Sequence, residues 1–309
     1  MNSEVKVLSQ PFIRTRSRVL DYTELMKPEL TFLAVLSTVC GFYLATPYRV
    51  NGWLFLHTAL GTALLGGGLG ALNQFIERKY DAMMRRTERR PLPAGRLLPL
   101  EVLIFGVVLS LTGILELTFF ANFLTGYLAS LTLVTYIFFY TPLKRVTLYS
   151  TIIGAIPGAL PPVLGWTAVR GSITPEAWAL FAILFCWQMP HFLSLAWMYR
   201  RDYARAGYKL LTVTDPTGVR SNRFILVFML ALIPASIMTT ILGLTGTYYL
   251  IGAVVLGLGF LYFGILLNVY SKENSSEPSA KIHVLSRRLF YASLIYLPLL
   301  MILMSADKI

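Results

Sequence analysis

The sequence predicts an all-α membrane protein, a polytopic bundle of about nine transmembrane helices. Hydrophobic residues make up 56% of the 309 positions and charged residues only 14%, whereas soluble domains have roughly 25% charged residues. The apolar residues also form long runs, each close to the ~20 residues that a helix needs to cross a bilayer. These runs do not alternate between polar and apolar positions, which excludes the strands of a transmembrane barrel.

The predicted spans are similar in length and are separated by polar segments. They cover residues 28–47, 53–76, 100–120, 122–140, 150–168, 176–199, 224–242, 247–270 and 288–304. Residues 1–27 are predicted to form a cytoplasmic N-terminal segment, and residues 28–305 a single transmembrane domain. The longest polar stretches between spans are the basic loops 77–99 and 200–223 and a linker at 271–281.

Positive charge is distributed unevenly between the two ends of the predicted spans. Of the 27 Lys and Arg residues, all but Arg49, Arg170 and Lys308 fall at one end. The positive-inside rule therefore predicts a cytoplasmic N-terminus and a C-terminus outside. The net charge of +12 is thus mainly a topology signal, and nucleic acid is not an expected partner.

Polar residues gather where the second predicted span ends. Asn73, Glu77 and Asp81 recur every four residues, which places one amide and two carboxylates on one face of a helix. Mg²⁺ prefers such hard oxygen ligands and usually shares them with substrate phosphates. We therefore interpret these three residues as a metal site, followed by arginines that could hold phosphate. The alternative is an interfacial helix whose acids form ordinary ion pairs with nearby Lys and Arg.

A second polar cluster ends the sixth predicted span. Trp187 and His191 share a helix face, and Pro190 is expected to kink the helix. A histidine at this depth is interpreted as a haem-iron ligand, as a proton-transfer group, or as a hydrogen-bonded structural residue. Glycines and prolines in the fifth span are typical of a broken helix that lines a cavity or packs on neighbouring helices. Glu116 is an acid within the third span, and no role is predicted for it.

These motifs resemble those of the UbiA-type intramembrane prenyltransferases. The spacing Asn73-x-x-x-Glu77-x-x-x-Asp81, followed by Arg86-Thr87 and Arg90-Pro91-Leu92, resembles the first motif of that superfamily. Within it, the chain is similar to the haem O synthase (protohaem IX farnesyltransferase) family over about residues 22–305. The segments that carry this closer resemblance are Tyr140-Thr-Pro-Leu-Lys144-Arg145, Trp187-x-x-Pro190-His191-Phe192 and Asp202-Tyr203-Ala-Arg-Ala-Gly207. Quinone-pathway relatives have a second aspartate-rich motif where this sequence has Trp187, His191 and Asp202.

The resemblance implies Mg²⁺-dependent transfer of a farnesyl group from farnesyl diphosphate to a vinyl group of haem b, giving haem O and diphosphate. Asn73, Glu77 and Asp81 would then be the catalytic and metal-binding residues at the cytoplasmic mouth of a central cavity. Residues of the second motif, Asp202 and Tyr203, would lie nearby, and His191 and Trp187 are predicted to bind haem. The basic residues predicted to bind the diphosphate are Arg85, Arg89, Lys144, Arg145 and Arg201.

The resemblance also implies partners and a location. The expected partners are farnesyl diphosphate, haem b, the lipid bilayer, and haem A synthase or a terminal oxidase in assembly. The expected location is the bacterial inner membrane, with the mitochondrial inner membrane as the alternative. Two other functions remain open: a UbiA-type prenyltransferase with an aromatic or quinone-precursor acceptor, and a membrane transporter, which would also have broken helices.

Overall fold

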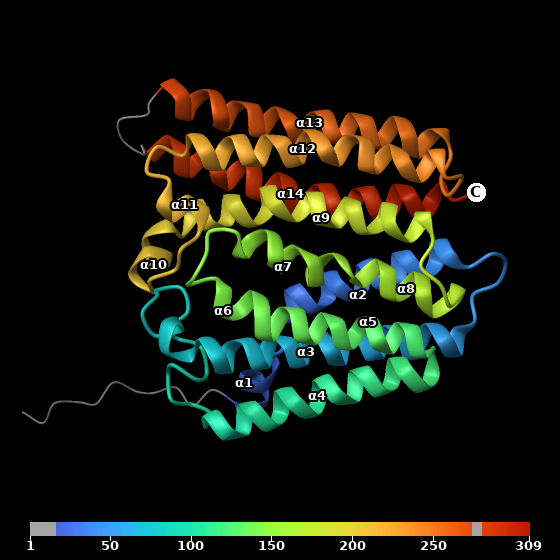
Figure 1. Ribbon diagram of the computed structural model, residues 1–309, viewed down its shortest axis with the longest axis horizontal. Coiled ribbons are helices and arrows are strands. Elements are labelled where there is room, and N and C mark those ends of the chain that lie inside the picture. The colour runs from blue at the N-terminus through green and yellow to red at the C-terminus, as the bar shows by residue number, and fades with distance from the viewer. Residues whose placement is uncertain (1–16, 274–279) are drawn as a thin grey trace, which may run out of the picture.

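The chain folds into a bundle of long helices that run side by side (Figure 1). The computed structural model describes residues 17–273 and 280–309. Within these two ranges, nine helical segments are long and apolar enough to cross a membrane, and each corresponds to one predicted span. The predicted all-α bundle of about nine transmembrane helices is therefore confirmed, and the orientation of its termini stays a prediction.

The helical elements include short ones at the ends of the bundle as well as the long ones that span it. In chain order they are α1 (Arg18–Leu25), α2 (Pro28–Ala45), α3 (Gly52–Asp81), α4 (Pro99–Phe120), α5 (Phe123–Val134), the π-helix η1 (Thr135–Tyr140), α6 (Thr141–Leu143), α7 (Ser150–Ala159), α8 (Pro161–Arg170), α9 (Pro175–Met198), α10 (Arg200–Arg205), α11 (Leu211–Thr214), α12 (Val219–Ile241), α13 (Thr247–Glu273) and α14 (Ala280–Ala306).

Three of the long helices, α3, α12 and α14, extend well beyond their predicted limits. Helix α3 continues from the predicted end at residue 76 to Asp81, so the three polar residues with fourfold spacing lie on one helix. Helix α14 begins at Ala280, eight residues before the predicted span, because a helix can carry exposed arginines at the bilayer surface. Residues 1–16 and 274–279, which belong to the predicted N-terminal segment and linker, lie outside the described residues.

The fifth span is broken, as its glycines and prolines predict. Helix α7 ends at Ala159 and α8 begins at Pro161. Proline is favourable at the first position of a helix because an N–H at that position would have no hydrogen-bond acceptor within the helix. Helix α8 packs directly on α2: a Cβ added to Gly165 would lie 1.9 Å from the Thr38 carbonyl oxygen. The break itself borders the central cavity described below.

Helices α3 and α4 make the most extensive helix–helix contact, through small residues. A Cβ added to Gly113 of α4 would lie 2.6 Å from both the Gly61 carbonyl oxygen and the Leu65 backbone nitrogen of α3. Lipid offers no hydrophobic force that drives helices together, so close backbone approach supplies the packing. At the far end of this contact the Glu116 carboxylate lies 2.5 Å from His57 Nδ1, which gives the acid within the third span a buried partner.

The close α3–α4 contact predicts a large difference between two Gly→Leu variants. Gly113→Leu must push backbone apart, which costs about 1–3 kcal/mol for overpacking, whereas a Cβ added to Gly259 of α13 meets nothing within 4 Å. Thermal unfolding in detergent should therefore show a clearly lower midpoint for Gly113→Leu and little change for Gly259→Leu. Equal midpoints for the two variants would contradict the packing described here.

Candidate functional site

The polar residues of α3 lie at the end of the bundle where α10, α11 and the 82–98 loop are also found (Figure 1). Asn73, Glu77 and Asp81 line a cavity of about 210 Å³ at this end. All three side chains are buried, with relative exposures of 1%, 6% and 1%. A buried carboxylate is costly unless a cation or hydrogen-bond donors compensate its charge, so the partners of these side chains define the site.

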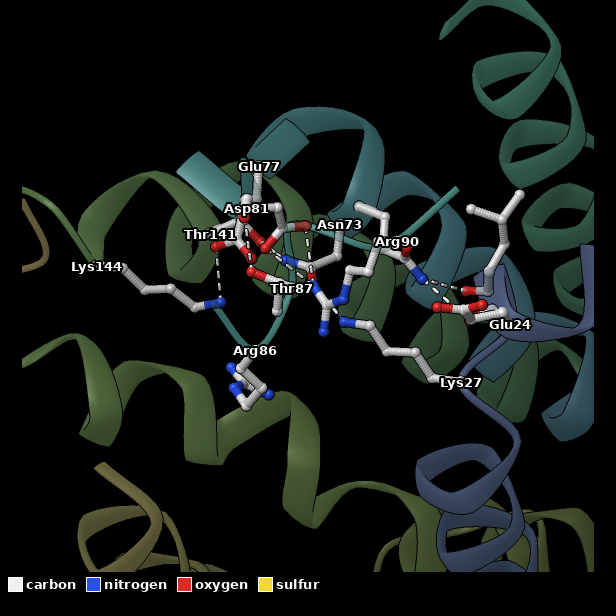
Figure 2. Close-up of polar contacts among 12 residues, drawn as sticks. Glu24, Lys27, Asn73, Glu77, Asp81, Arg86, Thr87, Arg90, Thr141 and Lys144 are labelled. Atoms are coloured by element: carbon white, nitrogen blue, oxygen red, sulfur yellow. Dashed lines mark hydrogen bonds and ion pairs between the residues drawn. The ribbon is translucent and has the colours of Figure 1, made fainter. Parts of the chain in front are cut away.

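Both carboxylates of α3 are paired with cations from later segments. Lys144 Nζ lies 2.8 Å from Glu77 Oε1. Arg90 NH1 donates to both carboxylate oxygens of Asp81, at 3.0 and 2.9 Å. Thr87 Oγ1 donates to the Asp81 carbonyl oxygen at 2.9 Å, which folds the loop back over the end of α3. The loop and the chain after α6 thus meet at the acidic face of α3 (Figure 2).

The third cation comes from the N-terminal side of the bundle. Lys27 precedes α2, and its ammonium group donates to Asn73 Oδ1 at 2.5 Å. The Asn73 amide nitrogen in turn donates to Thr141 Oγ1 at 3.4 Å. Burial and, to a smaller extent, the neighbouring charge of Arg90 lower the pKa of Lys27 to about 7. A bound anion would favour the charged form of this lysine.

Glu77 also affects two other ionisable groups at the cavity, Lys144 and Tyr208. Burial opposes the charge of Lys144, but Glu77 and nearby tyrosines outweigh burial and raise the pKa of Lys144 well above its usual value. Burial, and then the negative charge of Glu77, raise the pKa of Tyr208. Lys144 therefore stays charged and Tyr208 stays neutral, so both can act as hydrogen-bond donors at the mouth of the cavity.

The predicted second motif lies beside the loop that follows α3. Arg86 NH2 donates to the Tyr203 hydroxyl at 3.3 Å, and the Arg86 backbone N–H donates to Asp202 Oδ2 at 3.4 Å. Tyr203 and Arg86 both line the polar cavity. Asp202 also pairs with Arg205 at 3.0 Å. Asp202 therefore fastens α10 to the loop, while Tyr203 faces the cavity.

Of the five basic residues predicted to bind diphosphate, the structure brings only Lys144 to the polar cavity. Arg85, Arg89 and Arg201 are exposed and do not line it. Arg145 is also exposed and donates to the Tyr80 hydroxyl at 2.5 Å.

The cations that the sequence-based prediction missed are Lys27, Arg86 and Arg90. Because α3 ends at Asp81, the four-residue spacing of α3 no longer applies to the arginines after it. The pairs Arg86-Thr87 and Arg90-Pro91 in the first motif were the signal that could have identified two of them. No comparable signal marked Lys27.

A second cavity adjoins the polar one and reaches into the middle of the bundle. It has a volume of about 180 Å³ and is lined mainly by apolar residues of α2, α3, α8 and α9. Lys27, Gln188 and Phe192 are among the residues that line both cavities. The π-helix η1, a form that is frequent at functional sites, places Tyr136 at the same junction. A polar mouth thus leads directly into an apolar interior.

His191 and Trp187 line the apolar cavity. Their rings stack with centroids 4.7 Å apart, and both are held by Ser293 of α14. His191 Nδ1 lies 2.8 Å from Ser293 Oγ, and Trp187 Nε1 donates to the Ser293 carbonyl oxygen at 2.9 Å. The contact with Ser293 occupies one ring nitrogen of His191 and leaves Nε2 for another partner.

The composition of the polar cavity fits an anion together with a hard metal ion. Four cations, Lys27, Arg86, Arg90 and Lys144, surround two carboxylates, so the mouth carries net positive charge. In the described part of the chain no three His, Cys, Asp or Glu side chains are grouped as metal ligands. The Glu77 and Asp81 carboxylates and the Asn73 amide oxygen fit Mg²⁺ when phosphate and water oxygens complete its coordination.

The comparison with protein families identifies one model for most of the chain. The model of the UbiA prenyltransferase family matches residues 34–301. Relatives named protohaem IX farnesyltransferase are 45% identical over 298 residues in Solibacter usitatus and 43% identical over 287 residues in Salinibacter ruber. Each alignment covers 93% of this chain and 98% of the relative. The relative of that name in Koribacter versatilis is 39% identical over 312 residues, covering 100% of this chain and 99% of the relative.

Solved structures share the fold at low sequence identity. The structure of digeranylgeranylglyceryl phosphate synthase has a TM-score of 0.76 at 15% identity, covering 94% of this chain and 98% of that chain. A UbiA homologue from Archaeoglobus fulgidus, bound to DMAPP and Mg²⁺, has a TM-score of 0.61 at 12% identity, covering 90% and 99%. At these identities the likeness supports the arrangement of the helices and nothing finer.

Two pairs of arginines in the same loop allow a matched test of the polar cavity. Arg86→Gln or Arg90→Gln should weaken the binding of inorganic diphosphate with Mg²⁺ by about tenfold or more, as expected for loss of a hydrogen bond to a charged group. Arg85→Gln and Arg89→Gln should change it less than about twofold, because these side chains do not line the cavity. Isothermal titration calorimetry in detergent measures both. Equal losses of diphosphate affinity in all four variants would contradict the specific role of Arg86 and Arg90 at the cavity.

Proposed function

This chain belongs to the UbiA prenyltransferase family, and we propose that it is a protohaem IX farnesyltransferase that converts haem b, farnesyl diphosphate and water into haem O and diphosphate. The observation that carries this proposal is the junction of the two cavities, a cation-rich polar mouth that opens into an apolar interior containing His191. Farnesyl diphosphate has two matching parts, an anionic diphosphate and an apolar farnesyl chain. The names of the relatives from three bacteria supply the acceptor, haem b.

The polar mouth would hold the diphosphate of the donor. When the C1–O bond of farnesyl diphosphate breaks, the bonding electron pair leaves with the diphosphate, whose charge must be stabilised. Arg90 and Lys144 border the position that this charge would occupy and can stabilise it with charge-assisted hydrogen bonds, while Lys27 would bind the diphosphate both before and during bond cleavage. Mg²⁺ bound by Asn73, Glu77 and Asp81 would neutralise further charge on the leaving group.

The apolar cavity would hold the farnesyl chain. From Lys27 at the mouth to Ser37 deeper in α2 the helix rises about 15 Å. This depth suits the twelve-carbon backbone of an extended farnesyl group, about 14 Å with bonds of about 1.5 Å. Walls of Leu, Pro and Gly keep bulk water away from the allylic cation. The haem vinyl group attacks C1 of this cation, a water molecule adds to the resulting carbocation, and a proton is released.

His191 and Trp187 would bind the porphyrin. Trp187 and Phe290 flank the His191 ring, with centroids 4.7 and 4.9 Å from it, and such flat apolar surfaces suit a flat ligand. Because Nδ1 faces Ser293, Nε2 is the atom that would meet the haem iron or a propionate. We propose the bacterial inner membrane as the location, with the cation-rich mouth facing the cytoplasm, and haem A synthase or a terminal oxidase as the destination of haem O.

The acidic face of α3 is tested by turnover. Purified protein supplied with Mg²⁺, farnesyl diphosphate and haem b should yield a haem whose mass has increased by one farnesyl group and one hydroxyl group. Asp81→Asn should lower this rate at least about a hundredfold, since it removes a carboxylate that would hold the Mg²⁺ at the leaving group. Glu116→Gln, which alters an acid outside both cavities, should retain turnover within about threefold. Near-normal haem O formation by Asp81→Asn would contradict the site.

The haem half of the site is tested through His191. His191→Ala should weaken haem b binding by about tenfold and alter the haem absorption spectrum, while the apparent KM for farnesyl diphosphate stays within about twofold. His283→Ala, which removes an exposed histidine of α14, is the matched control and should change neither. If His191→Ala left haem binding intact but lost affinity for farnesyl diphosphate, His191 would belong to the diphosphate half instead.

A further inference from the structure

The connection between α1 and α2 has an unusual backbone conformation at Lys27. Among the described residues, Lys27 is the one non-glycine residue with positive φ, at 48°. A left-handed conformation is unfavourable for a residue with a Cβ and persists only where the surrounding structure holds it. The ammonium group of this residue reaches Asn73, so the contacts that fix the connection between α1 and α2 also fix the position of this ammonium group.

Close packing of the end of α1 against α3 is the first contact that fixes this connection. A Cβ added to Gly70 would lie 2.7 Å from the Leu25 carbonyl oxygen, so the end of α1 rests directly on the α3 backbone. The Gln74 side-chain nitrogen donates to the Glu24 and Leu25 carbonyl oxygens at 3.1 and 3.3 Å. These bonds satisfy carbonyl groups that a helix leaves free at its last turn, and they place the next residues over Asn73 (Figure 2).

A buried ion pair on α1 is the second contact that fixes this connection. Asp21 is only 2% exposed, and its Oδ1 accepts a hydrogen bond of 2.8 Å from Arg96 Nε. Arg96 also lies 3.5 Å from Glu24 and donates to the Arg89 carbonyl oxygen. A buried carboxylate that loses the cation paired with it is strongly unfavourable. Helix α1 can therefore occupy this position only where Asp21 meets Arg96.

We propose that Asp21 and Arg96 are positioning residues for the donor site. Their ion pair fixes α1, and α1 in turn fixes the left-handed turn that holds the Lys27 ammonium at the cavity. The proposal rests on the function proposed above, in which Lys27 binds the diphosphate. Neither Asp21 nor Arg96 lines the polar cavity, so their effect on the substrate passes through Lys27.

This arrangement has a specific kinetic consequence. Without the pair, α1 separates more readily from α3 and Lys27 relaxes to an ordinary conformation, so its ammonium spends less time at the cavity. Lys27 contacts the diphosphate both before and during bond cleavage, so loss of this contact weakens binding in both states. Such uniform loss raises KM and leaves kcat largely unchanged.

The same helix offers a matched control. Arg18 NH2 donates to both carboxylate oxygens of Glu101, at 2.9 and 3.0 Å. This pair also joins α1 to the start of α4, but its side chains are 68% and 32% exposed. Exposed ion pairs contribute little to stability. Breaking it should leave α1 and Lys27 in place.

The test compares single variants. Asp21→Asn and Arg96→Gln should each raise the apparent KM for farnesyl diphosphate about tenfold, with kcat and the KM for haem b within about threefold of the unmodified chain. Arg18→Gln should leave all three constants within about twofold. An unchanged KM for farnesyl diphosphate in both Asp21→Asn and Arg96→Gln would overturn the proposal.

A double variant separates positioning from general stability. If Asp21 acts through Lys27, then Asp21→Asn should add little to the raised KM of Lys27→Met, because the two changes remove the same contact. An additional tenfold rise in the Lys27→Met background would overturn the proposal, as would an unchanged KM for Lys27→Met alone. Absence of farnesyl transfer by the unmodified chain would instead overturn the proposed function itself.

Discussion

The burial of two carboxylates at the end of α3 is the constraint on which the site depends. Glu77 and Asp81 can be removed from water only if cations reach them, and the partners come from distant parts of the chain: Lys144 after α6 and Arg90 in the loop after α3. Lys27, which lies 46 residues before its partner Asn73, completes the set. The pairing therefore draws the ends of α2, α3 and α6 together and leaves a positively charged mouth above an apolar interior.

The same pairs account for how a charged substrate could enter without a large rearrangement. The cations hold the carboxylates in place, and they also lie where an arriving diphosphate would need them. A diphosphate with its metal ion offers the lysines and arginines a negative partner and offers the carboxylates a positive one, so each group exchanges one favourable contact for another. Preorganised charges of this kind stabilise a leaving group at little cost of reorganisation.

Much of this could be predicted from the sequence, for physical reasons that also explain what could not. The spans were predictable because the bilayer demands long apolar helices, and Asn73, Glu77 and Asp81 because they obey helical spacing. Arg85 and Arg89 could not be distinguished from Arg86 and Arg90 in the sequence, because a loop has no regular repeat from which the direction of a side chain can be predicted. The eight-residue helix α1 is too short to be stable alone; it depends on tertiary contacts, so neither it nor Lys27 was predicted.

The most direct test of the central claim is a structure determined with Mg²⁺ and a non-cleavable thio analogue of farnesyl diphosphate. We expect the diphosphate at the polar mouth, within hydrogen-bonding distance of Lys27, Arg90 and Lys144, with Mg²⁺ on the oxygens of Asn73, Glu77 and Asp81. The farnesyl chain should follow α2 into the apolar cavity. A diphosphate bound elsewhere, with the Glu77–Lys144 and Asp81–Arg90 pairs undisturbed, would contradict the central claim.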